Sequence, residues 1–222
     1  MTRPVRVPRN GLVAPGDRRE RRVPARVRGQ IERLLISSSC IRARVRQLAA
    51  AIAAEARRSG RPELHLVAVL KGAAAFATDL AAEVFRAGGP PVRFNFIKAS
   101  SYGNATVHHG EVKIEGQIPY ARGKDLLIVE DIVDTGLTIS RLQRYLERER
   151  KAASVRICAL LNKPDRRLPA LRKSLRLDYC GFDIPDLFVA GYGLDCAEHL
   201  RELPYIVVVN EEYFRRLAGG VP

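Results

Sequence analysis

The sequence predicts an α/β fold built on a mainly parallel sheet with helices on its flanks. Apolar runs of strand length occur at 64–70, 125–132 and 155–161, and such unbroken runs are typical of strands buried on both faces. Patterns with helical spacing lie between the runs. A strand, a helix and a second strand in this order form a unit whose two strands run parallel.

The elements follow one another in a regular order from about residue 39. Residues 40–58 place four apolar side chains at helical spacing with arginines on the other face, namely Ile41, Val45, Leu48 and Ile52. A second helix is expected over 73–87, after the first buried strand, and the glycines and prolines of 88–91 end it. The run VRFNFIKA at 92–99 predicts the next strand.

The second half of the chain adds a long polar segment and further strands. Residues 100–120 are polar, glycine-bearing and irregular, and their length suits a functional lid rather than a simple connector. They include His108 and His109, which have no further metal ligands at a suitable spacing. The remaining expected elements are a helix at 138–150, strands at 180–184, 187–193 and 204–210, and a short helix near 211–218.

The net charge of +14 is concentrated at the N-terminus. Residues 1–33 hold ten arginines and three acidic residues, which is half of the net charge, and they include four prolines. Because no periodicity is present, residues 1–35 are predicted to form a disordered basic arm ahead of one domain over 36–222. An alternative role for the arm is electrostatic attachment to RNA, DNA or an acidic partner, although it has no aromatic side chains to stack on bases.

Membrane and secretory signals are not found in the sequence. No apolar run approaches the roughly 20 residues that a membrane-spanning helix needs. The N-terminus has arginines but lacks the apolar stretch of a secretory signal, so a cytoplasmic location is expected. The four cysteines, Cys40, Cys158, Cys180 and Cys196, are widely spaced and form no C-x-x-C pair. Reduced, mostly buried thiols are therefore expected.

The stretch VEDIVDTGLT at 129–138 allows three interpretations. Asp-Thr-Gly after apolar residues is typical of half of an aspartic protease site, but two such loops must face each other and this chain has one. The strand-helix-strand setting also differs from an all-β protease. Clustered acids would suit a divalent metal ion. A strand that turns into a helix N-terminus could instead bind a phosphate with backbone N–H groups.

The position of this stretch favours the phosphate interpretation. Parallel sheets bind ligands at the carboxyl ends of their strands, where the loop 134–138 falls, and the ATP-binding pattern G-x-x-x-x-G-K-[ST] does not occur. Glu130 and Asp131 would repel a phosphate alone, but carboxylates accept hydrogen bonds from vicinal diols and attract hard cations. The ligand suggested is a ribose with a 5′-phosphate and a metal ion. A simpler alternative is an acidic strand end with Asp134 as a helix cap.

The same stretch resembles the phosphoribosyl-pyrophosphate motif of type I phosphoribosyltransferases. In that motif two acids and two apolar residues precede an acid and a Thr-Gly turn. Four other stretches make the chain similar to the hypoxanthine or hypoxanthine-guanine phosphoribosyltransferases. They are VLKGAAAF at 69–76, SSYG at 100–103, LLNKP at 160–164 and GFDIPDLFVAGYGLD at 181–195. The similarity runs from about residue 40 to 215 in the family's order, and residues 1–35 lie outside it.

The resemblance implies the type I phosphoribosyltransferase fold, with a small base-binding hood formed by about 36–60 and 165–215. It implies purine salvage, in which a 5-phosphoribosyl group moves from phosphoribosyl pyrophosphate to N9 of hypoxanthine or guanine. The products would be IMP or GMP and pyrophosphate. Mg²⁺ would be the cofactor, and relatives in this family form homodimers or homotetramers.

The resemblance also implies a role for each matched residue. Asp134 would help to move a proton at the purine N7 and is the expected catalytic residue. The expected contacts to phosphoribosyl pyrophosphate are Glu130, Asp131, Asp134, Thr135, Gly136, Leu137, Thr138, Lys71, Gly72, Ser101, Tyr102 and Arg201. The expected purine contacts are Lys163, Phe188, Val189 and Asp195, with Lys163 donating to O6 and thereby selecting oxopurines. The expected metal ligands are Glu130, Asp131 and Asp195.

Some positions depart from the family pattern, among them His199 and Leu200, which replace the usual bulky pair before Arg201. Cys196 stands where an aromatic residue is common, beside the expected metal ligand Asp195, and Leu137 stands where some relatives have a basic residue. The peptide bond between Leu70 and Lys71 is often cis in this family.

Two other functions remain as alternatives. One is a non-catalytic, nucleotide-sensing regulator of the same fold that binds RNA or DNA, with which the basic arm is compatible. Such a regulator need not keep four site residues together, whereas this chain has Asp134, Lys163, Phe188 and Asp195. The other alternative is an enzyme for xanthine or adenine, and Lys163 argues against adenine.

Overall fold

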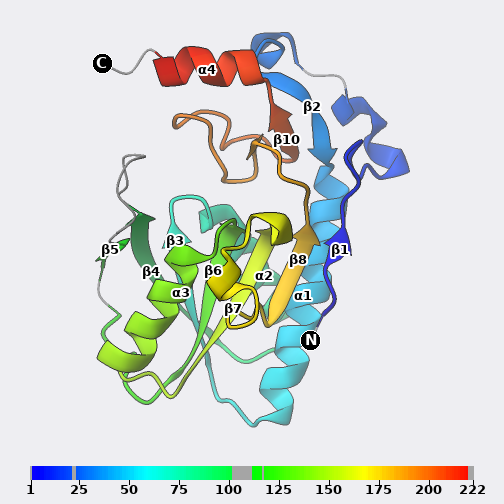
Figure 1. The fold of residues 1–222 in the computed structure, drawn as a ribbon. Helices are drawn as coiled ribbons and strands as arrows, with labels where there is room; N and C mark the ends of the chain where they lie inside the picture. The colour runs from blue at the N-terminus through cyan, green and yellow to red at the C-terminus, as the bar shows by residue number, and fades with distance from the viewer. Residues whose placement is uncertain (1, 22–23, 102–111, 117, 220–222) are drawn as a thin grey trace.

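The computed structural model describes residues 2–21, 24–101, 112–116 and 118–219, and its main feature is a seven-stranded sheet (Figure 1). The strand order is β1-β8-β7-β6-β3-β4-β5. Every neighbouring pair is parallel except β4 with β5, so the expected mainly parallel sheet is confirmed. The strands are β1 (Val5–Arg6), β3 (Leu64–Leu70), β4 (Val92–Ser101), β5 (Val112–Glu115), β6 (Asp125–Val133), β7 (Ser154–Asn162) and β8 (Tyr179–Asp183).

Helices cover both faces of this sheet. Helices α1 (Ser38–Arg58) and α2 (Ala74–Arg86) pack on one face, and α3 (Leu137–Arg144), with the π-helical turn η3 (Tyr145–Glu149), packs on the other. Side chains alternate along the strands, as the period of two requires. In β3, Leu66 and Ala68 belong to the core beneath α1 and α2, whereas Val67 and Val69 belong to the core beneath α3. The central strands are therefore apolar without interruption.

A second, three-stranded sheet forms the hood. Its antiparallel strands β2 (Ile31–Ile36), β10 (Ile206–Val209) and β9 (Val189–Ala190) are followed by α4 (Glu211–Gly219), and they lie beyond the carboxyl ends of the main strands (Figure 1). Of the range 36–60 that was expected to contribute to the hood, Ile36 lies in this sheet. The apolar face of α1 packs against the main sheet, and the N-terminal contribution to the hood is β2.

The segment 100–120 was expected to be irregular. The structure forms the short strand β5 within it, antiparallel to the end of β4. Residues 102–111, which include His108 and His109, lie outside the described residues.

The N-terminal segment packs against the domain, so the expectation of a disordered arm was wrong. Strand β1 pairs with β8, and Val7 is 2% exposed. The buried guanidinium of Arg44 in α1 donates a hydrogen bond to the carbonyl of Arg3 (2.5 Å) and another to the carbonyl of Cys180 (2.7 Å). A backbone contact from Leu12 to the Leu35 carbonyl (2.7 Å) continues this attachment. Attachment of the segment to nucleic acid or an acidic partner stays a prediction.

Two acids of this segment cap helix α1. The N-terminal N–H groups of a helix need acceptors, and the side chain of Ser37 at the cap position accepts from none of them. Instead, Asp17 accepts from the backbone N–H of Ser39 (3.0 Å), and Glu20 accepts from the backbone N–H of Ser38 (2.9 Å). Their negative charges also suit the positive end of the helix dipole. The acids in the arginine-rich segment therefore help to hold it in place.

Replacing Asp17 by asparagine should lower the melting temperature at pH 7 by a few degrees and remove part of the acid sensitivity of unfolding. Hydrogen bonds from Ser37 and Ser39 lower the pKa of Asp17 below its usual 3.8. The carboxylate therefore stabilises the fold above that value, and this contribution is lost as the pH falls through the lower folded-state pKa. Thermal unfolding at pH 7 and about pH 3 measures the effect. A gap between wild type and variant that does not narrow at the lower pH would contradict it.

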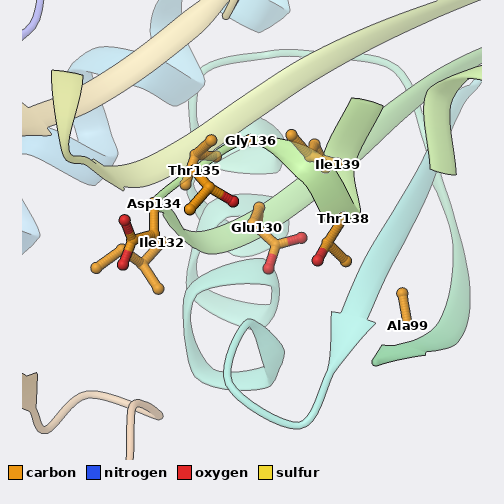
Figure 2. A pocket seen from close by; sticks show the side chains of 9 residues that line it. Ala99, Glu130, Ile132, Asp134, Thr135, Gly136, Thr138 and Ile139 are labelled. Atoms are coloured by element: carbon orange, nitrogen blue, oxygen red, sulfur yellow. The ribbon is translucent and has the colours of Figure 1, made fainter. Parts of the chain in front are cut away.

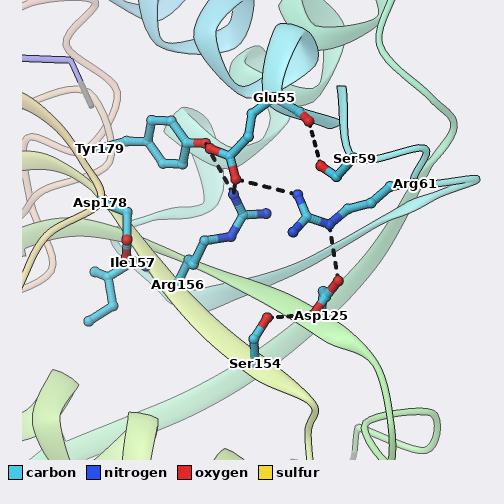
Figure 3. A network of polar contacts seen from close by, with 9 residues as sticks. All are labelled: Glu55, Ser59, Arg61, Asp125, Ser154, Arg156, Ile157, Asp178 and Tyr179. Atoms are coloured by element: carbon cyan, nitrogen blue, oxygen red, sulfur yellow. Dashed lines mark hydrogen bonds and ion pairs between the residues drawn. The ribbon is translucent and has the colours of Figure 1, made fainter. Parts of the chain in front are cut away.

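A polar network joins the amino ends of the strands, at the edge opposite the hood (Figure 3). Glu55 of α1 accepts from Tyr179 and pairs with Arg156, while Arg61 donates to Asp125 at the start of β6 (Nε to Oδ2, 3.0 Å). Ion pairs and hydrogen bonds saturate most of these groups. We therefore assign the network to stability and place the functional site at the other edge.

Two further expectations concern cysteines and membranes. All four cysteines are free, and Cys158, Cys180 and Cys196 are buried, as predicted. Among the described residues, no helix is both long enough and apolar enough to cross a membrane.

Candidate active site

The loop between β6 and α3 brings the N-terminus of a helix to the carboxyl end of a strand. Gly136 adopts φ 84° and precedes the first residue of α3, Leu137, so the first N–H groups of the helix face the loop. This left-handed conformation favours glycine, and a β-carbon here would also collide with Arg167 and Leu175. The hydroxyl of Thr135 accepts from the N–H of Leu137 (3.3 Å) and shapes the turn.

A cavity of about 370 Å³ opens in front of this loop (Figure 2). In Figure 2 the Glu130 carboxylate and the Thr138 hydroxyl point toward each other across it. The complete lining is Ala99, Glu130, Ile132, Val133, Asp134, Thr135, Gly136, Thr138 and Ile139. Five of the residues expected to bind phosphoribosyl pyrophosphate therefore line one cavity.

Two desolvated carboxyl groups lie beside the cavity. Burial raises the pKa of Glu130 well above its usual range, and the neighbouring Asp131 raises it further. Burial also raises the pKa of Asp131, although the N–H of Ile132 donates to its carboxylate (2.9 Å). Within the described part of the chain, Oε2 of Glu130 is buried without a hydrogen-bond partner. Adjacent buried carboxylates without enough donors are suited to a hard cation.

The Lys71-Gly72 loop meets both Asp131 and the hood. The Leu70–Lys71 peptide bond is cis, as the family resemblance implied. A β-carbon at Gly72 would overlap the Asp131 carboxylate, and one at Gly193 would overlap the Gly72 carbonyl, so the Gly72 backbone lies close to both the Asp131 side chain and the Gly193 backbone. The ammonium of Lys71 lies 2.8 Å from Oε2 of Glu198.

Asp195 and Arg201 stand together on the hood side of this loop. Nη2 of Arg201 lies 2.8 Å from Oδ1 of Asp195, and Nη1 of Arg201 donates to the Gly193 carbonyl (2.8 Å). The positive charge of Arg201 acts to lower the pKa of Asp131, against the larger effect of burial. Lys71, Gly72, Asp131, Asp195 and Arg201 thus form one connected group, as the sequence-based assignment requires.

Two basic side chains lie beside the expected catalytic carboxylate of Asp134, and both also pair with Asp186. Lys163, at the end of β7, has its ammonium 3.7 Å from Oδ2 of Asp134 and 3.3 Å from Oδ1 of Asp186. Nε of Arg166 lies 3.1 Å from Oδ1 of Asp134 and 3.8 Å from Oδ2 of Asp186. The residue Lys163 is only 7% exposed. The structure thus places Asp134 and Lys163 side by side.

Phe188 and Val189 lie at the hood, and Ser101 lies in the main sheet. Phe188 is 41% exposed and packs against Phe214 of α4, with ring centroids 4.4 Å apart. Val189 is buried in β9. Ser101 ends β4, opposite Val112 of β5, and Tyr102 lies outside the described residues.

Several residues at the site were missed from the sequence. Arg166, Asp186 and Glu198 each pair with a predicted site residue. Arg167 is 7% exposed and packs behind Gly136, with Nη2 donating to the Asn162 side chain (2.5 Å). In the sequence these residues resemble ordinary surface charges, and only their closeness to the LLNKP and GFDIPD motifs could have indicated them.

Neither a metal-binding cluster nor a second hollow offers an equivalent site in the described residues. In the described residues no group of three or more His, Cys, Asp or Glu side chains could by itself hold a metal ion. A second hollow of about 370 Å³ lies beside α3 and is lined mainly by Arg141, Arg144 and Arg148, with Ile114, Tyr145 and Glu149. This arginine hollow has neither the loop amides nor the paired acids of the first cavity.

Comparisons with known proteins agree with this geometry. Residues 41–196 match the phosphoribosyl transferase domain. The hypoxanthine-guanine phosphoribosyltransferase of Mycobacterium bovis is 41% identical over 191 residues, which cover 84% of this chain and 90% of the relative. The Bacillus subtilis protein of the same name is 42% identical over 181 residues, covering 81% and 94%. The solved hypoxanthine phosphoribosyl transferase of Trypanosoma cruzi is similar with a TM-score of 0.78 and 35% identity, covering 86% of this chain and 97% of that one.

Proposed function

The chain belongs to the phosphoribosyl transferase family, and from that premise we propose which of its residues perform the family's reaction. It is a hypoxanthine phosphoribosyltransferase of purine salvage that transfers the 5-phosphoribosyl group from phosphoribosyl pyrophosphate to a 6-oxopurine. No observation favours the regulator alternative. The observation that carries the site assignment is the closeness of the phosphate loop, the paired acids and the Asp134–Lys163 pair at one sheet edge.

The loop 134–138 holds the 5′-phosphate in this proposal. Its amides at the start of α3 and the hydroxyls of Thr135 and Thr138 are the donors. Glu130 and Asp131 accept from the ribose 2′- and 3′-hydroxyls. The pyrophosphate lies between the backbone of Lys71-Gly72 and Arg201, with the lid residues Ser101 and Tyr102 closing over it to exclude water.

The purine lies between the phosphate loop and the hood. Asp134 accepts the proton from N7 as N9 becomes the nucleophile, and Lys163 donates to O6. An amino group at C6 would face the Lys163 ammonium with two donors opposed, so adenine is disfavoured. Phe188 stacks on the ring, and the backbone of Val189 contacts its edge. In this proposal the hood is therefore the part of the domain that reads the base.

Mg²⁺ is the cofactor in this proposal, and the residues present fit it. Glu130 has a buried carboxylate oxygen without a partner, and burial raises the pKa of both Glu130 and Asp131, which a nearby cation would counteract. Asp195 would hold a second ion beside the pyrophosphate. When bound, the cation neutralises the charge of the pyrophosphate leaving group.

The location and assembly of the chain are also proposals. We propose that it acts in the cytoplasm as a homodimer or homotetramer. The support is its membership of a family in which such assemblies are found. Light scattering of the purified chain measures the mass, and a monomer at working concentration would contradict the proposed assembly.

Turnover should be seen on mixing the chain with phosphoribosyl pyrophosphate, Mg²⁺ and hypoxanthine or guanine. The ultraviolet absorbance of the base follows the reaction, and chelating the divalent ions should abolish it. Adenine should react at least about tenfold more slowly, because an unsatisfied buried donor costs about 1–3 kcal/mol. Equal rates with and without chelator would contradict the proposed use of the acids, and equal rates on adenine would contradict the role of Lys163.

A further inference from the structure

Each of the two charged residues proposed to contact the purine, Asp134 and Lys163, has a charged partner with no assigned role. The Lys163 ammonium lies closer to Asp186 (3.3 Å) than to Asp134 (3.7 Å). The Arg166 guanidinium lies closer to Asp134 (3.1 Å) than to Asp186 (3.8 Å). The four side chains therefore form a closed quartet of two acids and two bases with no net charge.

The buried Lys163 ammonium requires a carboxylate partner, and Asp186 supplies one. An ammonium that is 7% exposed is costly unless it is paired. If Asp186 were neutral, Asp134 would be the only carboxylate near this ammonium among the contacts described. Lys163 would then pair with Asp134, which is the carboxylate needed at the purine N7. Asp186 thus leaves Asp134 free for the base.

The backbone fixes the direction of Lys163. Its N–H donates to the Val133 carbonyl (2.9 Å), which places the residue beside the end of β6. An ammonium has three N–H donors. Asp186 accepts one of them (3.3 Å), and Asp134 lies beside the ammonium as an ion pair (3.7 Å), so a donor is left for an oxygen such as the purine O6. Arg166 holds the Asp134 carboxylate from its other oxygen and so balances the charge on that side.

We propose that Asp186 and Arg166 are a coupled positioning pair that holds Lys163 and Asp134 in register for a 6-oxopurine. The inference rests on the proposed roles of Asp134 and Lys163. The alternative is that Arg166 and Asp186 form an ordinary surface ion pair, since their side chains are 50% and 52% exposed. Exposed ion pairs contribute little, so that alternative predicts small and independent effects.

A double-mutant cycle separates the two views. Asp186→Asn and Arg166→Gln each leave the quartet with one unbalanced charge, and the double variant restores neutrality. We expect each single variant to lower kcat/KM for hypoxanthine about tenfold, with KM for phosphoribosyl pyrophosphate within about twofold of wild type. We also expect Asp186→Asn to narrow the preference for hypoxanthine over adenine. The double variant should lose clearly less than the product of the two single losses.

The controls distinguish a failure of this inference from unfolding of the variants and from a wrong role for Lys163. Glu83→Gln and Arg86→Gln remove an ion pair (2.7 Å) in α2, in which Arg86 is exposed and Glu83 is half-buried, and should leave all constants within twofold. Thermal unfolding checks that the variants fold. Unchanged kcat/KM in both single variants, strictly multiplicative losses, or an equal rise in KM for phosphoribosyl pyrophosphate would each overturn the pair. If Lys163→Ala keeps the wild-type preference for hypoxanthine over adenine, the proposed role of Lys163 fails, and that result is distinct from a failure of the pair.

Discussion

Replacing Asp134 by alanine should lower kcat by about 10²–10⁴-fold, which is the usual contribution of a positioned general acid or base. Asp134 directly follows strand β6, at the start of the phosphate loop. Its carboxylate lies within 4 Å of both the Lys163 ammonium and Arg166 Nε. No second carboxylate occupies the same place in the described cavity lining, since Glu130 is directed toward Thr138. The loss should therefore fall on the chemical step.

Asparagine at position 134 is the sharper variant. It keeps the size of the side chain and one oxygen that can accept from Arg166, but it carries no charge to attract the Lys163 ammonium and cannot accept a proton. We expect single-turnover rates of Asp134→Asn and Asp134→Ala to fall together, because product release can mask chemistry in kcat. A single-turnover rate within about threefold of wild type for Asp134→Asn would remove the proton-transfer role, whatever the alanine variant does.

Replacing Gly72 by alanine should lower kcat/KM by about 10²-fold, the effect of a misplacement of about 1 Å in an active site. The added methyl group would overlap the Asp131 carboxylate, and this carboxylate is a proposed contact to the ribose and Mg²⁺. Gly72 does not adopt a left-handed φ, so the damage should come from the displaced carboxylate rather than from backbone strain. The Mg²⁺ concentration needed for half-maximal rate should rise.

Gly29 is the matched control for that substitution. A β-carbon at Gly29 meets nothing within 4 Å, and its φ is also outside the left-handed region, so Gly29→Ala should have wild-type kinetics. Thermal unfolding of both variants shows whether the fold is kept. Normal turnover of the Gly72→Ala enzyme at low Mg²⁺ would contradict the proposed contacts of Asp131 with the metal ion and the ribose.

The central part of the fold could be predicted because its signals are local. The runs at β3, β6 and β7 are apolar on both faces, and the structure shows why: alternate side chains of β3 enter the cores beneath α1–α2 and beneath α3. The loop after β6 was predictable for a similar reason, since Asp-Thr-Gly-Leu-Thr is contiguous in the chain.

The N-terminal segment could not be predicted, because its partners are far away in sequence. Strand β1 has two residues and no periodicity, and it forms only by pairing with β8 about 180 residues later. Asp17 and Glu20 looked like the minor acids of a basic tail, yet they cap α1. Arg166 and Asp186 were missed for the same reason, since only the fold brings them to Asp134 and Lys163.

The most direct measurement is a crystal structure of the chain with inosine 5′-monophosphate bound. The account predicts that the phosphate accepts hydrogen bonds from the amides and hydroxyls of loop 134–138. It also predicts that O6 lies within hydrogen-bond distance of Lys163 Nζ, with N7 facing Asp134. A phosphate bound instead in the arginine hollow of Arg141, Arg144 and Arg148, or a purine remote from Lys163, would contradict the account.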